Sequence, residues 1–460
     1  MTKKLLFLIA FLPSIVLAQH TIKGKFTPAD EFKFAILYKV TPTTSIYVNN
    51  AEIDSIGNFQ FKLDTTITKG MYRIVYALPQ DEYNFDLIYN AKEDIELTFN
   101  LEEGAKFIKS EENKLLNAYT ESLQIVSKNI NAYYGGKQTK KEFHKVFDVL
   151  AETQNEFEKA SEGMLASHFI KASKPYIPTE MEDAQTFSKN VKANYFSNID
   201  FSNPTLQSSS FLIETVLNYV FTFTNPIDEN LGYKKNIDTV VAAIGNNATI
   251  KEIITEVLFN QFVDSKKEEV ANHIADNYLL PIATAKKDNA LIQKLTVYKN
   301  TSIGELAPNF TIEIPIDEKI ELVKLYDYKE ASQYVVVFWS STCSHCLEEL
   351  PKLQAYIKNL EEGKLKVIAV ALENDIYRWK DKTYDFPEFI HVFGEGKWEN
   401  PIGDAYGVTA TPTYFILDAN KNIIEKPDDF PALEAFYKEN PIILEKKENE
   451  EEDSEIINMD

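Results

Sequence analysis

The stretch "VVVFWSSTCSHCLEELPKL", residues 335–353, contains both cysteines of the 460-residue chain, Cys343 and Cys346. Apolar β-formers precede the pair and an amphipathic helical pattern follows it, so we expect Cys343 at the start of a helix. Unpaired backbone amides and the helix dipole lower the pKa of a thiol at such a position. Cys346, one helical turn later, is close enough to attack a mixed disulfide formed at Cys343. The spacing therefore predicts a reversible dithiol switch.

Around this stretch, strand patterns alternate with helical patterns from about residue 300 onward, which indicates an α/β sheet. The predicted strands are 310–314, 334–339, 365–372, 390–393 and 414–418. The predicted helices between them lie near 343–360 and 376–384. The cysteine pair thus follows a buried strand directly.

Two segments of this region resemble the thioredoxin superfamily: residues 335–353 and "GVTATPTYFILDANKNII" at 407–424. "CSHCLEELP" is similar to the exported TlpA/ResA branch, whose pattern is C-x-x-C-x-x-E-x-P, and "IGELAPNF" at 303–310 also looks like that branch. The resemblance implies a thioredoxin-like α/β domain over residues 301–445 and the activity of a protein thiol-disulfide oxidoreductase. It implies no cofactor beyond a redox-active disulfide Cys343–Cys346, and no metal.

The resemblance also implies catalytic roles. Cys343 becomes the nucleophile, and Cys346 the resolving thiol. Glu349 matches the branch's carboxylate after the motif, which tunes the thiol pKa values and can take or give the proton during resolution. A glutamate in the first turn of a helix is also a common complement to the helix dipole, which is the role we expect for neighbouring Glu348.

Three further residues are expected to face the substrate. In the TlpA/ResA branch the loop threonine and proline, here Thr411 and Pro412, carry a cis proline that faces the disulfide and binds the substrate backbone. Trp339, four residues before Cys343, is expected to shield one side of the site and belongs to the predicted substrate-binding residues.

The direction of electron flow is left open by two departures from related motifs. Val337 stands where cytoplasmic thioredoxins have a buried aspartate, so proton transfer must use another group, for which we favour Glu349. Ser344 and His345 separate the cysteines, whereas reducing members of the branch usually have proline before the second cysteine. A histidine here resembles strongly oxidising members, in which it stabilises the thiolate and the reduced state. We favour a reductase or electron-relay role, with an oxidase or isomerase as the alternative.

The first residues predict export. Lys3 and Lys4 precede an apolar run that ends in small residues, so we expect a signal peptide over residues 1–18 and a soluble periplasmic or cell-envelope protein. The formal net charge of −22 makes nucleic acid a poor partner. The expected partners are substrate proteins with thiols or disulfides, and a membrane or periplasmic redox partner.

The remaining chain completes a multi-domain α+β architecture. Strand patterns predict a small antiparallel, sandwich-like β domain over residues 19–104, which looks like the β domain ahead of thioredoxin domains in exported Bacteroidetes proteins. Helical periodicity, beginning with an N-cap at Ser110, predicts an all-α domain over residues 105–300. Residues 446–460 are expected to be an acidic disordered tail. The oligomeric state is not indicated.

Two other functions are alternatives to the predicted thiol-disulfide oxidoreductase. A metal-thiolate carrier for a soft ion such as Cu(I) would use the cysteine pair as ligands, although structural zinc usually needs four ligands and only Cys343, Cys346 and His345 are offered locally. An exported binding protein would recognise a partner through its first 300 residues. We rank it lower because the cysteine pair, Trp339, Glu349 and the Thr411–Pro412 pair occur together.

Overall fold

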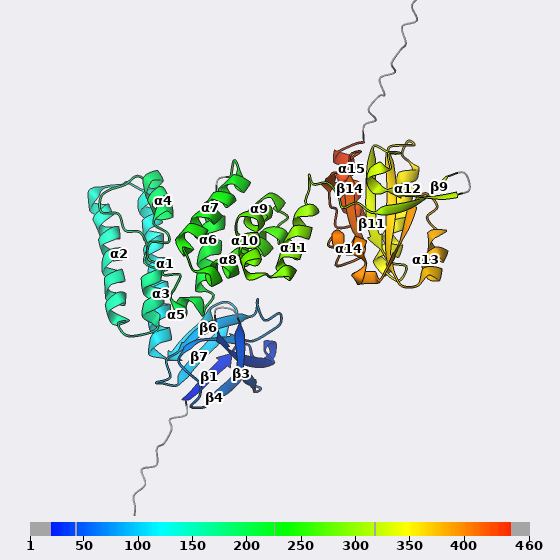
Figure 1. The fold of residues 1–460 in the computed structure, drawn as a ribbon. Helices are drawn as coiled ribbons and strands as arrows, with labels where there is room; N and C mark the ends of the chain where they lie inside the picture. The colour runs from blue at the N-terminus through cyan, green and yellow to red at the C-terminus, as the bar shows by residue number, and fades with distance from the viewer. Residues whose placement is uncertain (1–19, 42–43, 225, 317–318, 443–460) are drawn as a thin grey trace, which may run out of the picture. The chain divides into compact units, whose positions relative to one another are not determined.

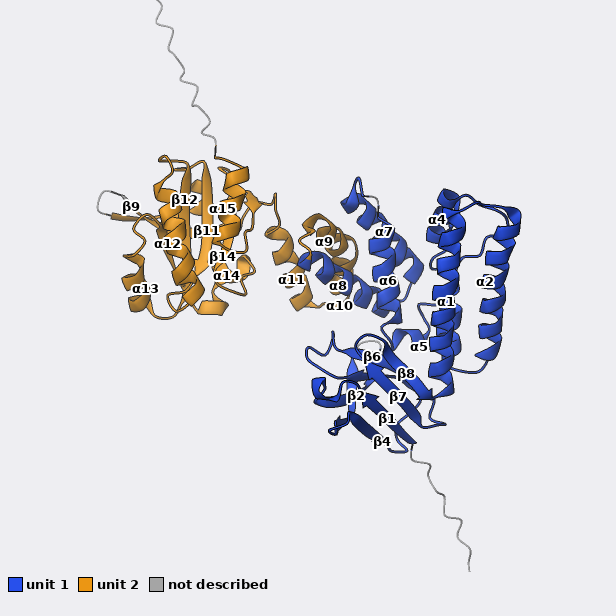
Figure 2. Cartoon of the chain, turned by 180° about the vertical axis from the view of Figure 1, so that it is seen from behind, with its two compact units in different colours: residues 1–264 blue, residues 265–460 orange. Residues whose placement is uncertain are grey.

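The computed structural model describes residues 20–41, 44–224, 226–316 and 319–442 (Figure 1). The predicted signal peptide and the predicted acidic tail lie outside these residues. The chain forms two compact units, residues 1–264 and residues 265–460 (Figure 2). The helical region predicted over 105–300 is thus divided between the two units, and the predicted domain boundaries stay a prediction.

The first unit begins with two four-stranded sheets whose facing side chains form one core. One sheet contains, in order, β4 (Asn58–Leu63), β1 (His20–Phe26), β7 (Ile95–Asn100) and β8 (Gly104–Lys109). The other contains β3 (Ser45–Glu52), β2 (Phe34–Val40), β5 (Gly70–Val75) and β6 (Asn84–Tyr89). In strand β4, Phe59, Phe61 and Leu63 are buried and alternate with exposed residues, as a half-buried strand requires.

The prediction of an antiparallel β domain is wrong for one pair of strands, because β1 and β7 are parallel. All other strand pairs in the two sheets are antiparallel. Alternating hydrophobicity assigns a face to each residue but carries no information on the direction of the neighbouring strand. A parallel neighbour needs a long connection, which the chain supplies by building the second sheet between β1 and β7.

Helices fill the rest of the first unit. Their bounds are α1 (Glu111–Gly135), α2 (Lys140–Ala160), α3 (Ala166–Ala172), α4 (Ala184–Ala193), α5 (Pro204–Gln207), α6 (Phe211–Thr222), α7 (Glu229–Ile244) and α8 (Ala248–Asp264). Helix α1 begins after Ser110, whose side chain accepts a hydrogen bond from the Asn113 amide, so the predicted N-cap is confirmed. The buried Asn113 side chain also bonds both backbone groups of Ile88 in β6, which ties α1 to the sandwich. Helices α1 and α2 run side by side (Figure 1).

The second unit begins with the helical segments α9 (Glu268–Ile274), η2 (Ala275–Leu279), α10 (Leu280–Lys286) and α11 (Asn289–Asn300). A hairpin of β9 (Thr311–Ile316) and β10 (Lys319–Lys324) follows. The main sheet contains, in order, β13 (Ile390–Glu395), β12 (Leu365–Glu373), β11 (Gln333–Trp339), β14 (Thr413–Leu417) and β15 (Ile423–Glu425). The other segments are α12 (Ser344–Lys358), α13 (Ile376–Thr383), α14 (Pro401–Ala405), α15 (Phe430–Glu439) and the 3-10 turns η3 (Leu325–Asp327) and η4 (Lys397–Glu399).

Both faces of the five-stranded sheet are covered, which buries every residue of β11 from Tyr334 to Trp339. Val335, Val337 and Trp339 pack with side chains of α12 and α15, whereas the alternate residues face the core that includes β9. Strands β11, β12 and β13 are parallel, and β14 is antiparallel to β11. The carboxyl ends of the three parallel strands and the start of β14 therefore meet at one edge of the sheet. This edge carries the cysteines.

The expected α/β architecture of this region is confirmed. The first and last residues of each predicted strand lie within two residues of those of an observed strand. No helix within the described ranges is both long and apolar enough to cross a membrane.

Candidate active site

Cys343 is the N-cap residue of α12, directly after the turn that leaves β11. Its Sγ accepts a hydrogen bond from the amide of Cys346 at 3.1 Å, and the two cysteines form a disulfide with their Cα atoms 5.3 Å apart. The Cys346 side chain is 0% exposed, whereas Cys343 is partly exposed. An incoming reactant can therefore reach only Cys343, whose sulfur lies where helix amides favour negative charge.

The loop before β14 lies against the disulfide because β14 pairs antiparallel with β11. The Thr411–Pro412 peptide bond is cis, as the resemblance implied. The Sγ of Cys343 is 3.3 Å from the carbonyl oxygen of Thr411, an acceptor for the Cys343 thiol once the disulfide is reduced. The amide of Cys346 favours the Cys343 thiolate, and the carbonyl of Thr411 favours the thiol. The two groups therefore stabilise opposite protonation states of the same sulfur.

Glu349 lies one turn after Cys346 on α12 and is half-buried. Its Oε2 accepts hydrogen bonds from the hydroxyl of Tyr414 at 2.8 Å and from the amide of Phe430 at 2.9 Å. Burial, and then the bond to Glu349, raise the pKa of Tyr414 far above its usual value, so this hydroxyl stays a donor. Glu349 Oε1 has no hydrogen-bond partner among the described residues, which leaves one oxygen free to exchange a proton.

The position of Trp339 corrects one prediction. Its side chain is fully buried and packs with Phe386, in the same core as Cys346. A substrate cannot contact this ring in the observed conformation, so Trp339 covers the inner side of the site and is not a substrate-contacting residue. Trp339 is the last residue of β11, and its side chain faces α12. The surroundings of this position depend on the order of the strands in the sheet, which is a tertiary feature.

Ser344 and His345 are both exposed in the first turn of α12. Neither side chain makes a hydrogen bond within the described part of the chain. The tuning role of His345 therefore stays a prediction, and the geometry supplies no partner that would hold its ring over Cys343.

The loop between β11 and Cys343 is held by a carboxylate that sequence reasoning missed. Glu373, at the end of β12, is 1% exposed, and its Oε1 accepts hydrogen bonds from the amide of Ser341 and from the Ser340 hydroxyl at 3.1 Å. The carbonyl of Ser340 in turn accepts the Cys343 amide at 3.1 Å. A sequence signal existed, because a carboxylate that ends an apolar parallel strand lies at the edge where neighbouring strands also end. For Tyr414 the sequence signal was its position two residues after Pro412, the proline that was expected to face the disulfide.

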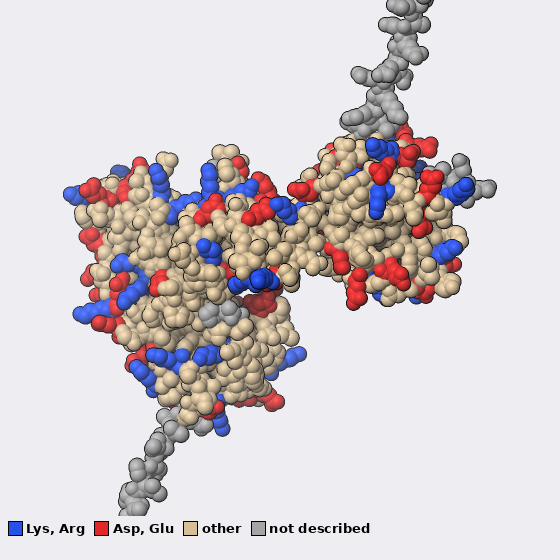
Figure 3. All heavy atoms as spheres, viewed as in Figure 1, with Lys and Arg blue, Asp and Glu red and all other residues tan. Residues whose placement is uncertain are grey.

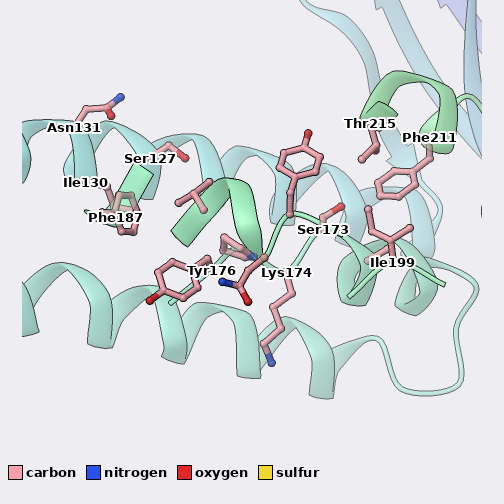
Figure 4. Close-up of a pocket in the computed structure, with 15 residues that line it drawn as sticks. Ser127, Ile130, Asn131, Ser173, Lys174, Tyr176, Phe187, Ile199, Phe211 and Thr215 are labelled. Atoms are coloured by element: carbon pink, nitrogen blue, oxygen red, sulfur yellow. The ribbon is translucent and has the colours of Figure 1, made fainter. Parts of the chain in front are cut away.

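A cavity of about 410 Å³ lies in the first unit and is lined mainly by apolar and aromatic side chains. Figure 4 shows Phe187, Tyr176 and Phe211 among its lining residues. Its Lys174 is already paired with Glu158 at 3.1 Å. Across the described ranges, no group of three or more histidine, cysteine, aspartate and glutamate side chains is arranged to hold a metal ion.

The chain is similar to known proteins over part of its length. The AhpC/TSA family model matches residues 303–426. The thiol-disulfide oxidoreductase ResA of Bacillus thuringiensis subsp. konkukian (strain 97-27) is 30% identical over 135 residues, which are 28% of this chain and 72% of the relative. ResA of Bacillus cereus (strain ATCC 10987 / NRS 248) is 30% identical over 128 residues, 27% of this chain and 68% of the relative. A crystal structure of a thioredoxin-like protein from Bacteroides caccae ATCC 43185 has a TM-score of 0.41 and 18% identity, and the match covers 57% of this chain and 96% of that one.

Proposed function

Because this chain belongs to the ResA-like thiol-disulfide oxidoreductases of the thioredoxin superfamily, we propose that it reduces disulfides of substrate proteins, or relays electrons to them, through a transient mixed disulfide at Cys343. The observation that carries the proposal is the asymmetry of the pair. Cys343 is partly exposed at a helix N-terminus, and Cys346 is buried one turn behind it. A substrate can therefore reach the sulfur of Cys343, whereas the sulfur of Cys346 can react only with Cys343.

In the reducing direction, the Cys343 thiolate attacks one sulfur of a substrate disulfide and expels the other as a thiolate. The Cys346 thiolate then attacks the Cys343 sulfur, which forms the Cys343–Cys346 disulfide and releases the second substrate thiolate. Two electrons pass to the substrate. Glu349 supplies the base that takes the Cys346 proton, through the oxygen not engaged by Tyr414 and Phe430. A dithiol of a membrane or periplasmic redox partner must then reduce the disulfide again.

The reducing direction is supported by the surroundings of His345. A strong oxidant needs its reduced form stabilised, and an imidazole held beside the sulfur would supply that stabilisation. His345 is exposed and has no hydrogen-bond partner among the described residues, so water screens its charge. Equilibration of the pair with glutathione tests this direction. A potential near about −270 mV, as in thioredoxin, is expected, and one near about −120 mV would reverse the assignment.

The proposed site of action is the periplasm or cell envelope. It is supported by the basic residues and apolar run of residues 1–18 and by the small residues before the expected cleavage site. Mass determination of the mature chain from a cell-envelope fraction tests the proposal. A chain that retains Met1 and stays in the cytoplasm would contradict it.

Trapping of covalent adducts tests the mechanism. Cys346→Ala removes the resolving thiol, so this variant should accumulate mixed disulfides with disulfide-containing proteins, visible on non-reducing gels. Cys343→Ala is the matched control and should accumulate none, since its remaining sulfur is buried. Equal and low trapping by both variants in the export compartment would overturn the mechanism.

A further inference from the structure

Three loops lie together at the edge of the sheet that carries the disulfide. They follow β11, β12 and β13, which are parallel and therefore end at the same edge. Glu373 bonds the loop before Cys343 at Ser340 and Ser341. The next residue, Asn374, accepts a hydrogen bond from the amide of Gly396 at 3.2 Å, which joins the second loop to the third. The loops beyond β12 and β13 are thus fixed relative to Cys343.

These loops expose large apolar side chains. Ile376 and Tyr377 begin α13 and are 48% and 84% exposed, and Trp398 in η4 is 54% exposed. The hydrogen bond between the two loops lies two residues from Ile376 and two residues from Trp398. Apolar side chains that are this exposed beside a reactive disulfide can contact a polypeptide that presents its cysteine to Cys343.

The same two loops also carry carboxylates. Asp375, Glu395 and Glu399 are exposed on the same two loops, and none has an ion-pair partner among the described residues. The opposite edge of the sheet differs, because three of its carboxylates are each paired with a lysine. These pairs are Glu361 with Lys364 at 3.2 Å, Asp385 with Lys382 at 3.0 Å, and Glu388 with Lys358 at 2.9 Å.

The charge of the edge follows from all of its exposed ionisable side chains. The acidic ones on the loops and the adjoining helix starts are Glu348, Asp375, Glu395, Glu399 and Asp404, and the basic ones are His345, Arg378, Lys380 and Lys397, so acidic side chains are in the majority. Figure 3 shows acidic side chains at the end of this unit where α13 and α14 lie in Figure 1. We call Ile376, Tyr377, Trp398, Asp375, Glu395 and Glu399 together the acidic aromatic surface.

We propose that the acidic aromatic surface binds a lysine- and arginine-rich segment beside the reacting cysteine of the substrate protein. The inference rests on the proposed function and names the substrate class of the same site. Lysine and arginine suit the surface for two reasons. Their cations can pair with carboxylates that have no ion-pair partner among the described residues, and they lie favourably over the faces of tryptophan and tyrosine rings. Their aliphatic stems cover apolar area such as Ile376. An acidic segment would meet like charge at Asp375, Glu395 and Glu399.

Exchange rates with defined peptides test the inference. The reduced protein is mixed with peptides of equal length that contain one disulfide flanked by lysine and arginine, by serine, or by glutamate. In a single turnover the peptide disulfide is reduced and Cys343–Cys346 is oxidised, and acid-quenched samples are read by mass spectrometry. We expect the basic peptide to react about tenfold faster than the serine peptide at low ionic strength, and the ratio to fall towards one as salt is added.

Matched variants locate the effect on the surface. Tyr377→Ser combined with Trp398→Ser should slow the basic peptide about fivefold to tenfold, the loss expected for two cation–ring contacts. Glu395→Gln combined with Glu399→Gln should slow it and weaken its salt dependence. The controls are Tyr384→Ser, which removes a 73% exposed ring at the other end of α13, and Glu362→Gln at the opposite edge. Both controls should leave the rates unchanged.

A small uncharged disulfide separates the two proposals. Bis(2-hydroxyethyl) disulfide, a linear uncharged disulfide, should react equally with all of these proteins. Failure of every disulfide, including this one, would overturn the proposed function. Normal exchange with equal rates for the three peptides, or equal losses in test and control variants, would overturn the substrate class alone.

Discussion

Replacement of Tyr414 by phenylalanine removes one oxygen from the core beside the disulfide and leaves the ring. The Tyr414 hydroxyl donates to Glu349 Oε2 at 2.8 Å, and no other donor than the Phe430 amide reaches that oxygen within the described residues. A hydrogen bond to a carboxylate contributes about 1.5–3 kcal/mol to stability. We therefore expect Tyr414→Phe to lower the free energy of unfolding of this unit by about 2 kcal/mol.

Tryptophan fluorescence during urea unfolding measures this loss in the full chain. All three tryptophans, Trp339, Trp379 and Trp398, lie in the second unit, so the signal reports that unit alone. With a urea dependence of about 2 kcal/mol per molar, the midpoint should fall by about 1 M. The dependence itself should not change, because the variant exposes no new surface on unfolding.

Tyr437→Phe is the matched control. Tyr437 is buried in the same core as Tyr414, but its hydroxyl has no hydrogen-bond partner among the residues that the structure describes. Removal of a buried and unpaired hydroxyl should leave stability unchanged or raise it slightly. Equal midpoint shifts in the two variants, or a loss below about 0.5 kcal/mol for Tyr414→Phe, would refute the role given to the bond with Glu349.

Two further predictions concern a buried and a partly buried ionisable residue of the same unit. Glu373→Ala leaves the Ser341 amide without its acceptor and should cost about 2 kcal/mol in the same urea assay, while Glu373→Gln, which keeps an acceptor, should cost less than half as much; equal losses would contradict the bonding role. Burial lowers the pKa of His391 below its ordinary 6.5. The unfolded chain therefore takes up a proton that the folded chain does not, so stability is full above pH 6.5 and falls as the pH drops from there towards the folded pKa. His391→Gln should flatten this decline in a series of urea midpoints, and an unaltered slope would show that another group titrates.

Local sequence patterns predicted the elements around the site well. The N-cap of α1 at Ser110 and the start of α12 at Cys343 depend on contacts within one helical turn, which residue spacing encodes directly. Buried strands such as β11 and β12 stand out as apolar runs between helical patterns. In the first unit, however, the β domain was expected to end at residue 104, whereas β8 continues the sheet to Lys109.

The sequence alone determined the chemistry of the cysteine pair, because nucleophile, resolving thiol and helix start all fall within four consecutive residues. Only the tertiary structure decided what supports that pair. Tyr414 reaches Glu349 across 65 residues of chain, and Glu373 reaches Ser341 across 32. The parallel pairing of β1 with β7 and the complete burial of Trp339 were decided in the same way. Periodicity fixes which face a side chain occupies, whereas its partner depends on strand order and direction, and these are set by the packing of the whole sheet.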